Sequence, residues 1–257
     1  MKPYIFLKKL LPARIKNKIK RALIELPGRL GDYANITYSQ EGEDRILDIL
    51  FGVLNKKNGY YVDVGAHHPQ RFSNTNLFYL QGWRGINIDA NAEAIALFQE
   101  MRPRDINVAF GVGERAGKST FYIFDEPALN TFNEKTAHNV VNNSTNKITE
   151  ERIVEVIPLS QILDSYLPKG QYIDLLNVDV EGSDLAVLKS NDWSRYVPLY
   201  ILVELHSGEN QKEGFSFNEV LNSEITQYLQ SKGYSVFAKT LNTLFFILKK
   251  CSTESVL

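Results

Sequence analysis

Apolar runs alternate with helically spaced apolar residues along most of this sequence. The runs that predict buried strands cover residues 60–64, 86–89, 106–110, 172–180 and 199–205. Apolar residues at helical spacing predict helices after the acidic stretch 39–44 and over residues 74–81, 92–101, 184–189 and 217–231. Because strands that alternate with helices form parallel sheets, the pattern predicts an α/β fold with helices on both faces of the sheet.

The last part of the sequence departs from this alternation. Two β-rich runs, residues 234–239 and 243–248, are separated only by Thr240-Leu241-Asn242, a spacing that fits a hairpin better than a crossover helix. We therefore expect a mostly parallel sheet that ends in an antiparallel hairpin. Two other β-like stretches, residues 120–124 and 152–157, flank the asparagine-rich residues 139–146, which we expect to form a mobile loop.

A glycine turn follows the first predicted strand. Gly65 comes directly after that strand, and the second strand ends on Asp89, 26 residues after Asp63. A strand, a glycine turn, a helix and a strand that ends in a ribose-binding carboxylate form the first half of a nucleotide-binding unit. The turn lacks the further glycines that bring a backbone close to a pyrophosphate, which argues against NAD or FAD. Asp63 suits a ligand with an ammonium group, such as S-adenosylmethionine; the alternative is a buried strand followed by a chance glycine.

The composition, with 44% hydrophobic residues, fits one catalytic domain, residues 39–257, after a basic amphipathic extension, residues 1–38. The net charge of −1 implies no nucleic-acid partner, and the single cysteine, Cys251, excludes an internal disulfide framework and fits the cytoplasm. Residues 1–30 contain nine Lys or Arg and one acid, Glu25. This segment either contacts an anionic membrane or a partner, or forms a solvated basic helix, and its charges exclude a transmembrane span.

Several short motifs carry a resemblance to a known family: Ser39-Gln40, Glu43-Asp44, Val62-Asp63-Val64-Gly65-Ala66, Ser73-Asn74-Thr75, Asn87-Ile88-Asp89 and Asn177-Val178-Asp179-Val180-Glu181-Gly182. On these motifs, of which the last is the most specific, residues 39–246 resemble the FkbM-type methyltransferases. The resemblance implies a Rossmann-like class I methyltransferase fold with a mostly parallel seven-stranded sheet. It also implies an S-adenosylmethionine-dependent O-methyltransferase that acts on a hydroxyl of a sugar or sugar-containing metabolite in polysaccharide or natural-product biosynthesis.

The same resemblance assigns a cofactor site. Asp63 and Gly65 would border the methionine arm, and Asp89 would bind the ribose hydroxyls. Val108 and Ala109 would face the adenine. The full set expected around the cofactor is Gln40, Asp63, Gly65, Ala66, Asn74, Asp89, Ala90, Val108, Ala109 and Asp179.

A sugar hydroxyl is a poor nucleophile, so methyl transfer to it needs a general base or a metal ion. Asp179 and Glu181 follow one predicted strand, and Glu204 and His206 follow the next. Residues two apart in an extended strand project to one face, and neighbouring strands lie about 4.8 Å apart, so we expect these four side chains to converge. They would then bind Mg²⁺ or Mn²⁺, in an arrangement similar to that of catechol O-methyltransferase. The alternative is that carboxylates at strand ends only cap nearby helices.

Without a metal ion the candidate bases are histidines, because the imidazole pKa lies near working pH. We expect His206, His67 or His68 in this role, and Asp179, His206 and His67 form the predicted catalytic set. An alternative for the adjacent pair His67-His68 is that one ring caps the cofactor loop. Two other functions stay open: a nicotinamide-dependent oxidoreductase and a non-catalytic binding module on a methyltransferase scaffold. The expected partner is a small molecule, a nucleotide-activated or glycan-linked sugar.

Overall fold

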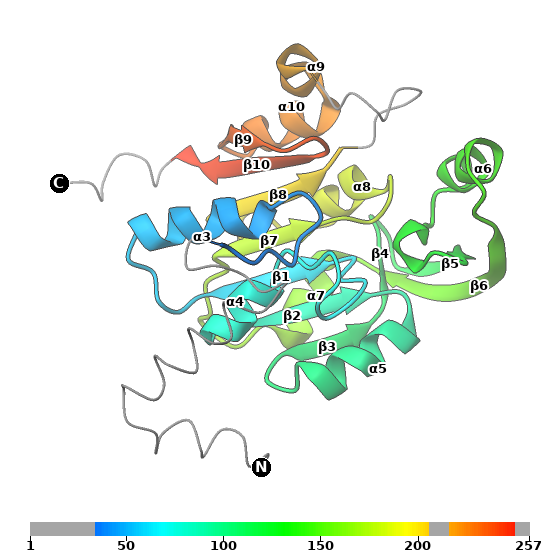
Figure 1. Ribbon diagram of the computed structural model, residues 1–257, viewed down its shortest axis with the longest axis horizontal. Helices are drawn as coiled ribbons and strands as arrows, with labels where there is room; N and C mark the ends of the chain where they lie inside the picture. The colour runs from blue at the N-terminus through cyan, green and yellow to red at the C-terminus, as the bar shows by residue number, and fades with distance from the viewer. Residues whose placement is uncertain (1–33, 206–215, 250–257) are drawn as a thin grey trace. The chain divides into compact units, whose positions relative to one another are not determined.

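The computed structural model describes residues 34–205 and 216–249. The chain divides into two units, and the second, Thr37–Leu257, contains a seven-stranded sheet of order β3-β2-β1-β7-β8-β10-β9 (Figure 1). The strands of this sheet are β1 (Tyr60–Val64), β2 (Arg84–Asp89), β3 (Ile106–Ala109), β7 (Leu175–Val178), β8 (Tyr200–Glu204), β9 (Tyr234–Lys239) and β10 (Thr243–Leu248). The helices around it are α3 (Glu43–Val53), α4 (Asn76–Gln81), α5 (Ala92–Met101), α7 (Leu159–Tyr166), α8 (Asp184–Lys189), α9 (Phe217–Asn222) and α10 (Glu224–Ser231).

The strands pair as the predicted fold requires. β1 pairs in parallel with β2 and β7, and β7 pairs in parallel with β8. β10 runs antiparallel between β8 and β9. The mostly parallel seven-stranded sheet with an antiparallel C-terminal hairpin is therefore confirmed. The strand order turns back between β1 and β7, and sheets of this kind bind ligands beyond the carboxyl ends of the strands at that point.

Helices cover both faces of the sheet, as predicted. On one face, Tyr61 of β1 packs in a cluster with aromatic side chains of α3 and of the α4 region, where the ring centroids of Phe51 and Trp83 lie 4.7 Å apart. On the other face, Val62 and Val64 pack in a cluster with residues of α7, α8 and α10. Every residue of β1 is buried, because side chains alternate between the two faces and both faces are covered.

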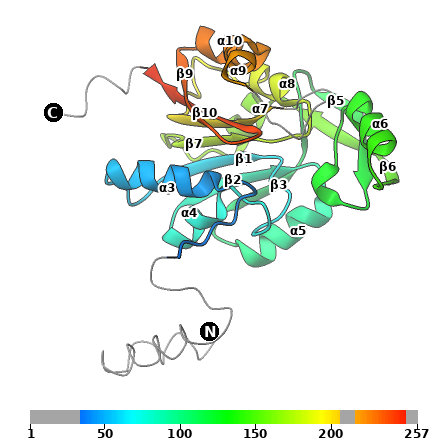
Figure 2. The ribbon, with the colours of Figure 1, turned by 45° about the horizontal axis from the view of Figure 1, so that its top comes forward.

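A smaller, three-stranded sheet follows β3 in the chain, with the order β4-β6-β5. Its strands are β4 (Gly111–Val112), β5 (Gly117–Phe124) and β6 (Ile148–Ile157), and the short helix η1 (Pro127–Leu129) and α6 (Glu134–Asn143) connect β5 to β6. Figures 1 and 2 both show α6 and the two long strands together at one end of this unit. The predicted strands over residues 120–124 and 152–157 are thus present and longer than expected.

The predicted loop over residues 139–146 is wrong for residues 139–143, because α6 extends to Asn143, whereas residues 144–146 belong to neither a helix nor a strand. Asn133 caps this helix with its side-chain oxygen, which accepts a hydrogen bond from the N–H of Thr136 at 3.1 Å. Ala137 is buried, while Asn139 and the asparagines that follow it in the helix are exposed. A good cap and a buried contact outweigh the low helix propensity of these asparagines.

The predicted helix over residues 217–231 is in fact two helices, α9 and α10, which meet at Ser223. Ser223 has extended backbone angles (φ −66°, ψ 146°), and its hydroxyl oxygen accepts the N–H of Thr226 at 3.1 Å. Serine is a preferred N-cap residue, so this side chain begins a new helix within a run of helical spacing. Helix α7 (Leu159–Tyr166) is a further element that we do not predict from the sequence.

Candidate functional site

A cavity lies at the carboxyl ends of the central strands, and most of the predicted site residues line it. From the predicted cofactor set, the lining residues are Gln40, Asp63, Gly65, Ala66, Asn74, Asp89, Ala90 and Asp179. His67, Glu181 and Glu204 line the cavity as well. The parallel sheet therefore gathers residues from both halves of the sequence around one space.

The structure does not bring Val108 or Ala109 into this cavity. Val108 belongs to the hydrophobic core and is only 7% exposed, and Ala109 is exposed outside the cavity. The cavity wall at this point is formed by Phe110, Gly111 and Val112, which lead from β3 into the second sheet. The chain thus reaches the cavity only after β3 has ended at Ala109. The spacing of apolar residues predicts the strand but not the residue at which the chain meets the cavity.

Another part of the wall comes from β5 and the segment after it, and we do not predict it from the sequence. These residues are Phe121, Pro127, Ala128, Asn130 and Phe132. The rings of Phe121 and Phe132 pack together with centroids 4.7 Å apart. The apolar residues of the β-like run 120–124 indicate that one side of this strand is buried. The pattern of a half-buried strand does not indicate whether that side packs in the core or lines a cavity.

Gly65 lets the ends of β1 and β7 approach each other. Its φ is +79°, and a Cβ atom at this position would lie 1.7 Å from the carbonyl oxygen of Asp179. The N–H groups of Gly65 and Ala66 donate to the carbonyl oxygen of Ile88 at 2.9 and 3.1 Å. The turn is therefore folded over the end of β2, as the nucleotide-binding pattern requires, and no other residue type fits at Gly65 without strain.

Asp89, the last residue of β2, binds the turn through its side chain. Its carboxylate accepts hydrogen bonds from the backbone N–H of His67 at 2.8 Å and of Asn91 at 2.7 Å. Burial raises the pKa of Asp89 to about 6. The residue predicted to bind the ribose thus also positions the loop at the cavity.

Asp63 lies in the cavity wall but is only 2% exposed. It accepts hydrogen bonds from Thr75 Oγ1 at 2.6 Å and from Asn177 Nδ2 at 2.9 Å. Burial raises the pKa of Asp63, while the hydrogen bond from Thr75 and the charge of Arg102 act in the opposite direction. Asn177, which belongs to the most specific motif but is not among the predicted site residues, lines the cavity as well.

His67 and His68 have different environments. Burial and the charge of Arg71 lower the pKa of His67 to about 4, so its ring is neutral near neutral pH. Its Nε2 atom is buried and has no hydrogen-bond partner among the described residues. His68 Nδ1 accepts the backbone N–H groups of Gln70 and Arg71, both at 3.0 Å. His68 therefore caps the loop, which is the alternative considered for one of the two rings.

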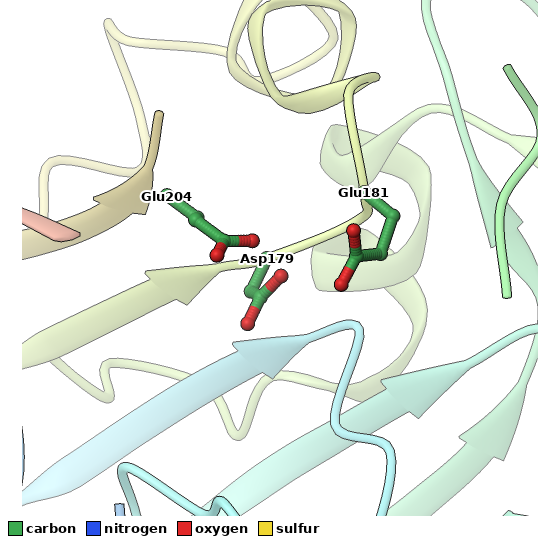
Figure 3. Close-up of side chains that lie close together, drawn as sticks. All are labelled: Asp179, Glu181 and Glu204. Carbon is green, nitrogen blue, oxygen red and sulfur yellow. The ribbon is translucent and has the colours of Figure 1, made fainter. Parts of the chain in front are cut away.

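Three carboxyl groups converge at the edge of the sheet. Asp179 and Glu181 follow β7, Glu204 ends β8, and one oxygen of each side chain lies within 4.8 Å of the other two. Figure 3 shows the three side chains close together at these strand ends. We call these residues the carboxyl trio. Their predicted convergence is confirmed, and the fourth predicted member, His206, lies outside the described residues.

The carboxyl trio has an unusual electrostatic state. Burial, followed by the charges of neighbouring carboxylates, raises the pKa of Glu181 and of Glu204 well above the usual range. Carboxylates this close cannot all ionise without a compensating charge. A shared proton or a bound cation would offset this repulsion.

A second cavity adjoins the first. Its own lining residues are Arg71, Glu126, Leu129, Asn146, Leu205 and Asn242, and it shares Gln40, Phe72, Ala128, Glu181 and Glu204 with the first cavity. Arg71 donates two hydrogen bonds to Glu126, at 2.7 and 2.9 Å, and its guanidinium lies over the Phe72 ring. Two members of the carboxyl trio therefore lie where the two cavities meet.

Comparisons with known proteins give a family match. The model of the methyltransferase FkbM domain matches residues 63–236, which is more than half of the chain. No curated protein matches the sequence.

Three solved structures of methyltransferases are similar to this chain at low sequence identity. A TehB-like SAM-dependent methyltransferase from Corynebacterium glutamicum is 14% identical, with a TM-score of 0.41, over 93% of this chain and 100% of the other. A proposed RNA methyltransferase from Pyrococcus horikoshii is 11% identical, with a TM-score of 0.37, over 91% of this chain and 98% of the other. The small RNA methyltransferase HEN1 is 12% identical, with a TM-score of 0.38, over 90% of this chain and 29% of the other.

Proposed function

Because this chain belongs to the FkbM methyltransferase family and is an S-adenosylmethionine-dependent methyltransferase, we propose that it methylates a hydroxyl group of a sugar or sugar-containing metabolite. The observation that carries this proposal is the position of Glu181 and Glu204, which border both cavities. The first cavity holds the cofactor and the second holds the acceptor. The acceptor hydroxyl then meets the methyl group beside carboxylates that can take up its proton.

The second cavity supports a sugar as the acceptor. Amide, guanidinium and carboxylate groups line it, from Arg71, Glu126, Asn146 and Asn242. Together these groups offer the donors and acceptors that sugar hydroxyls require. The ring of Phe72, over which the Arg71 guanidinium lies, adds apolar surface to the same wall. A nucleotide-activated or glycan-linked sugar of a polysaccharide or natural-product pathway is the proposed substrate.

The reaction is an in-line displacement. A lone pair of the acceptor oxygen attacks the methyl carbon, the C–O bond forms as the C–S bond breaks, and the sulfur keeps the electrons of the broken bond. The turn at Gly65 and the carboxylate of Asp89 position the cofactor, and the apolar side chains of the second sheet exclude water. Without a bound cation, the hydroxyl proton would pass to an ionised carboxylate of the carboxyl trio. His67 is a weaker base, because a pKa of about 4 leaves it little affinity for a proton.

The carboxyl trio also fits a divalent cation. Its members supply carboxylate oxygens, which are the ligands that Mg²⁺ and Mn²⁺ prefer. A cation would offset the repulsion that raises the pKa of Glu181 and Glu204. We propose that the trio binds Mg²⁺ or Mn²⁺ and that His206 is a further ligand. When bound, the cation would lower the pKa of the acceptor hydroxyl.

Chelation tests the cation. EDTA should abolish turnover and leave the Kd of S-adenosylhomocysteine nearly unchanged, because the cation acts on the acceptor. Added Mn²⁺ or Mg²⁺ should restore the rate. Full activity in metal-free buffer would contradict the proposal that a cation is required. A carboxylate of the trio or His206 would then be the base that accepts the hydroxyl proton.

An acceptor screen tests the function itself. The enzyme is incubated with S-adenosylmethionine and a panel of nucleotide-activated sugars, and mass spectrometry follows the gain of one methyl group. Glu204→Gln should lose turnover and retain cofactor binding, whereas Glu93→Gln, which alters an exposed acid outside both cavities, should retain both. Methylation of nitrogen or carbon would contradict O-methylation. Binding of S-adenosylhomocysteine without turnover on any acceptor would favour a non-catalytic module.

The location of the enzyme is a further part of the proposal. Within residues 34–205 and 216–249, none of the helices has the length and apolar character of a membrane span. Residues 1–30, with their nine basic side chains, lie outside the described residues. We propose a cytoplasmic enzyme that this segment holds at an anionic membrane surface.

A further inference from the structure

A buried arginine lies behind the cofactor cavity. Arg102 follows α5 with 0% exposure, and its Nε atom lies 3.0 Å from Asp105 Oδ2. The guanidinium also lies over the rings of Tyr61, Tyr79 and Phe98, at 5.0 to 5.2 Å from their centroids. Burial of a charge is costly unless its donors are fully used. The partners of the Arg102 guanidinium therefore indicate which part of the site this residue positions.

A hydrogen bond leads from Arg102 toward Asp63. Arg102 Nη1 donates to Thr75 Oγ1 at 3.1 Å, and Thr75 Oγ1 lies 2.6 Å from Asp63 Oδ2. A guanidinium has donors only, so Thr75 accepts from it and uses its own proton toward Asp63. Arg102 thus fixes the direction of these two hydrogen bonds: Arg102 donates to Thr75, and Thr75 donates to Asp63.

The hydrogen bonds continue from Asp63 to the cavity. Asp63 and Asn177 are neighbours in the register of β1 and β7, and Asn177 Nδ2 donates to Asp63 Oδ1 at 2.9 Å. Asn74 Nδ2 in turn donates to Asn177 Oδ1 at 2.9 Å. Because the carboxylate accepts, each amide presents its nitrogen toward Asp63 and its oxygen away from it. The last group, Asn74 Oδ1, is therefore an acceptor.

Asn74 Oδ1 is buried and has no hydrogen-bond partner among the described residues. Asn74 is one of the residues that line the cofactor cavity, and it is only 8% exposed. A buried acceptor without a partner is costly, which points to a ligand that supplies a donor. Of the cofactor's donors, the ribose hydroxyls are expected at Asp89, and the α-ammonium group is expected on the methionine arm beside Asp63, to which Asn74 connects through Asn177.

We propose that Asn74 Oδ1 binds the α-ammonium group of the cofactor's methionine arm and that Arg102 is a positioning residue, acting through Thr75, Asp63 and Asn177. This inference rests on the proposed cofactor site. The carboxylate of Asp63 polarises the two amides in series and so strengthens the acceptor at Asn74.

The test compares ligands with and without the ammonium group. Asn74→Leu keeps the size of the side chain and removes its oxygen. In titration calorimetry on the full chain, its affinity for S-adenosylhomocysteine should fall about tenfold or more. Affinity for decarboxylated S-adenosylmethionine, which keeps the ammonium, should fall by a similar factor. Affinity for 5′-methylthioadenosine, which has no amino-acid arm, should not change.

Asn191→Leu is the matched control. Asn191 is also 8% exposed and also has a buried oxygen without a partner, but it does not line the cavity. This variant should bind all three ligands like the wild type. Thr75→Val, which breaks the link to Arg102 and keeps the side-chain shape, should weaken only the two ammonium-bearing ligands, and it tests the relay even if Asn74→Leu does not fold.

Equal weakening of all three ligands in Asn74→Leu, or no weakening at all, would overturn the inference. A loss confined to S-adenosylhomocysteine would also overturn it, because the contact would then be to the carboxylate. Failure of the wild-type protein to bind S-adenosylhomocysteine would instead reject the proposed function.

Discussion

At the scale of a single residue, Asp89 holds a loop and is also the residue predicted to bind the ribose. Its oxygens accept the N–H groups of His67 and Asn91, so the carboxylate holds the loop beside the cavity. Each oxygen keeps a second lone pair, which can accept from a ribose hydroxyl. Burial raises the pKa of this group to about 6, which brings its change of charge close to physiological pH.

Replacement of Asp89 by alanine should weaken cofactor binding. It removes a charged acceptor for the ribose, a hydrogen bond worth roughly 1.5 to 3 kcal/mol, and it also releases the loop. We expect the Kd of S-adenosylhomocysteine to rise tenfold or more by calorimetry. Asp164→Ala, which alters an exposed acid outside both cavities, is the control. Unchanged affinity in a folded Asp89→Ala protein would reject the ribose assignment.

The raised pKa of Asp89 also predicts a pH dependence. Folding raises this pKa from 3.8 to about 6, so the protonated group stabilises the unliganded protein at low pH, and this contribution is lost as the pH rises through about 6. A ribose hydroxyl donates to the ionised form and favours it. Affinity for S-adenosylhomocysteine should therefore fall as the pH drops below about 6. Calorimetry on wild type and Asp89→Asn checks this, since the variant should lack the Asp89-dependent fall.

At the scale of elements, the second sheet holds the loop that follows β7. Glu181 has a φ of 53°, a conformation that non-glycine residues rarely adopt. Thr131 Oγ1 donates to the carbonyl oxygen of Glu181 at 2.7 Å, and Asn133 Nδ2 donates to that of Gly182 at 3.0 Å. The segment between β5 and α6 thus stabilises the strained backbone that presents one member of the carboxyl trio.

Thr131→Val tests this contact between elements. The change keeps the side-chain shape and removes a hydrogen bond worth about 0.5–1.5 kcal/mol. The backbone at Glu181 should then adopt its observed conformation less often. We expect kcat to fall severalfold while the Kd of S-adenosylhomocysteine stays nearly constant. Thr149→Val, which removes a bond to Ile123 on the exposed part of the same sheet, should leave kcat unchanged. A Thr131→Val enzyme with wild-type kcat would show that the contact does not serve catalysis.

At the scale of the whole molecule, two sheets build the cavities. The main sheet supplies the turn at Gly65, Asp89 and the carboxyl trio, and the second sheet supplies an apolar wall. These parts all belong to the unit Thr37–Leu257. Cofactor binding should therefore not need the residues that precede this unit.

Deletion of residues 1–30 tests whether cofactor binding and membrane association depend on different parts of the chain. Affinity for S-adenosylhomocysteine should stay at the wild-type value, because the sheet and both cavities begin later in the chain. The full chain should sediment with vesicles that contain anionic lipid, and the truncated chain should not. Loss of cofactor binding on truncation would contradict the assigned domain start, and equal sedimentation of both chains would contradict the membrane contact.

Local patterns were enough to predict most elements and much of the site. The bounds predicted for β1, α5 and α8 agree with those observed, because alternation, helical spacing and end signals act over a few neighbouring residues. The convergence of the carboxyl trio was predictable for a related reason: parallel strands bring their carboxyl ends to one edge of the sheet. Cap signals were missed at Asn133 and Ser223, although they too are local.

Contacts between distant segments were decided only by the tertiary structure. Asp63 and Asn177, 114 positions apart, become partners because β1 lies beside β7, and Thr131 reaches Glu181 because the second sheet packs near that loop. Arg102 is buried, against the usual exposure of arginine, since Asp105 and a group of aromatic rings replace its water. Such contacts depend on the combined fit of many side chains in space, whereas a sequence pattern reports only which face of each element is apolar.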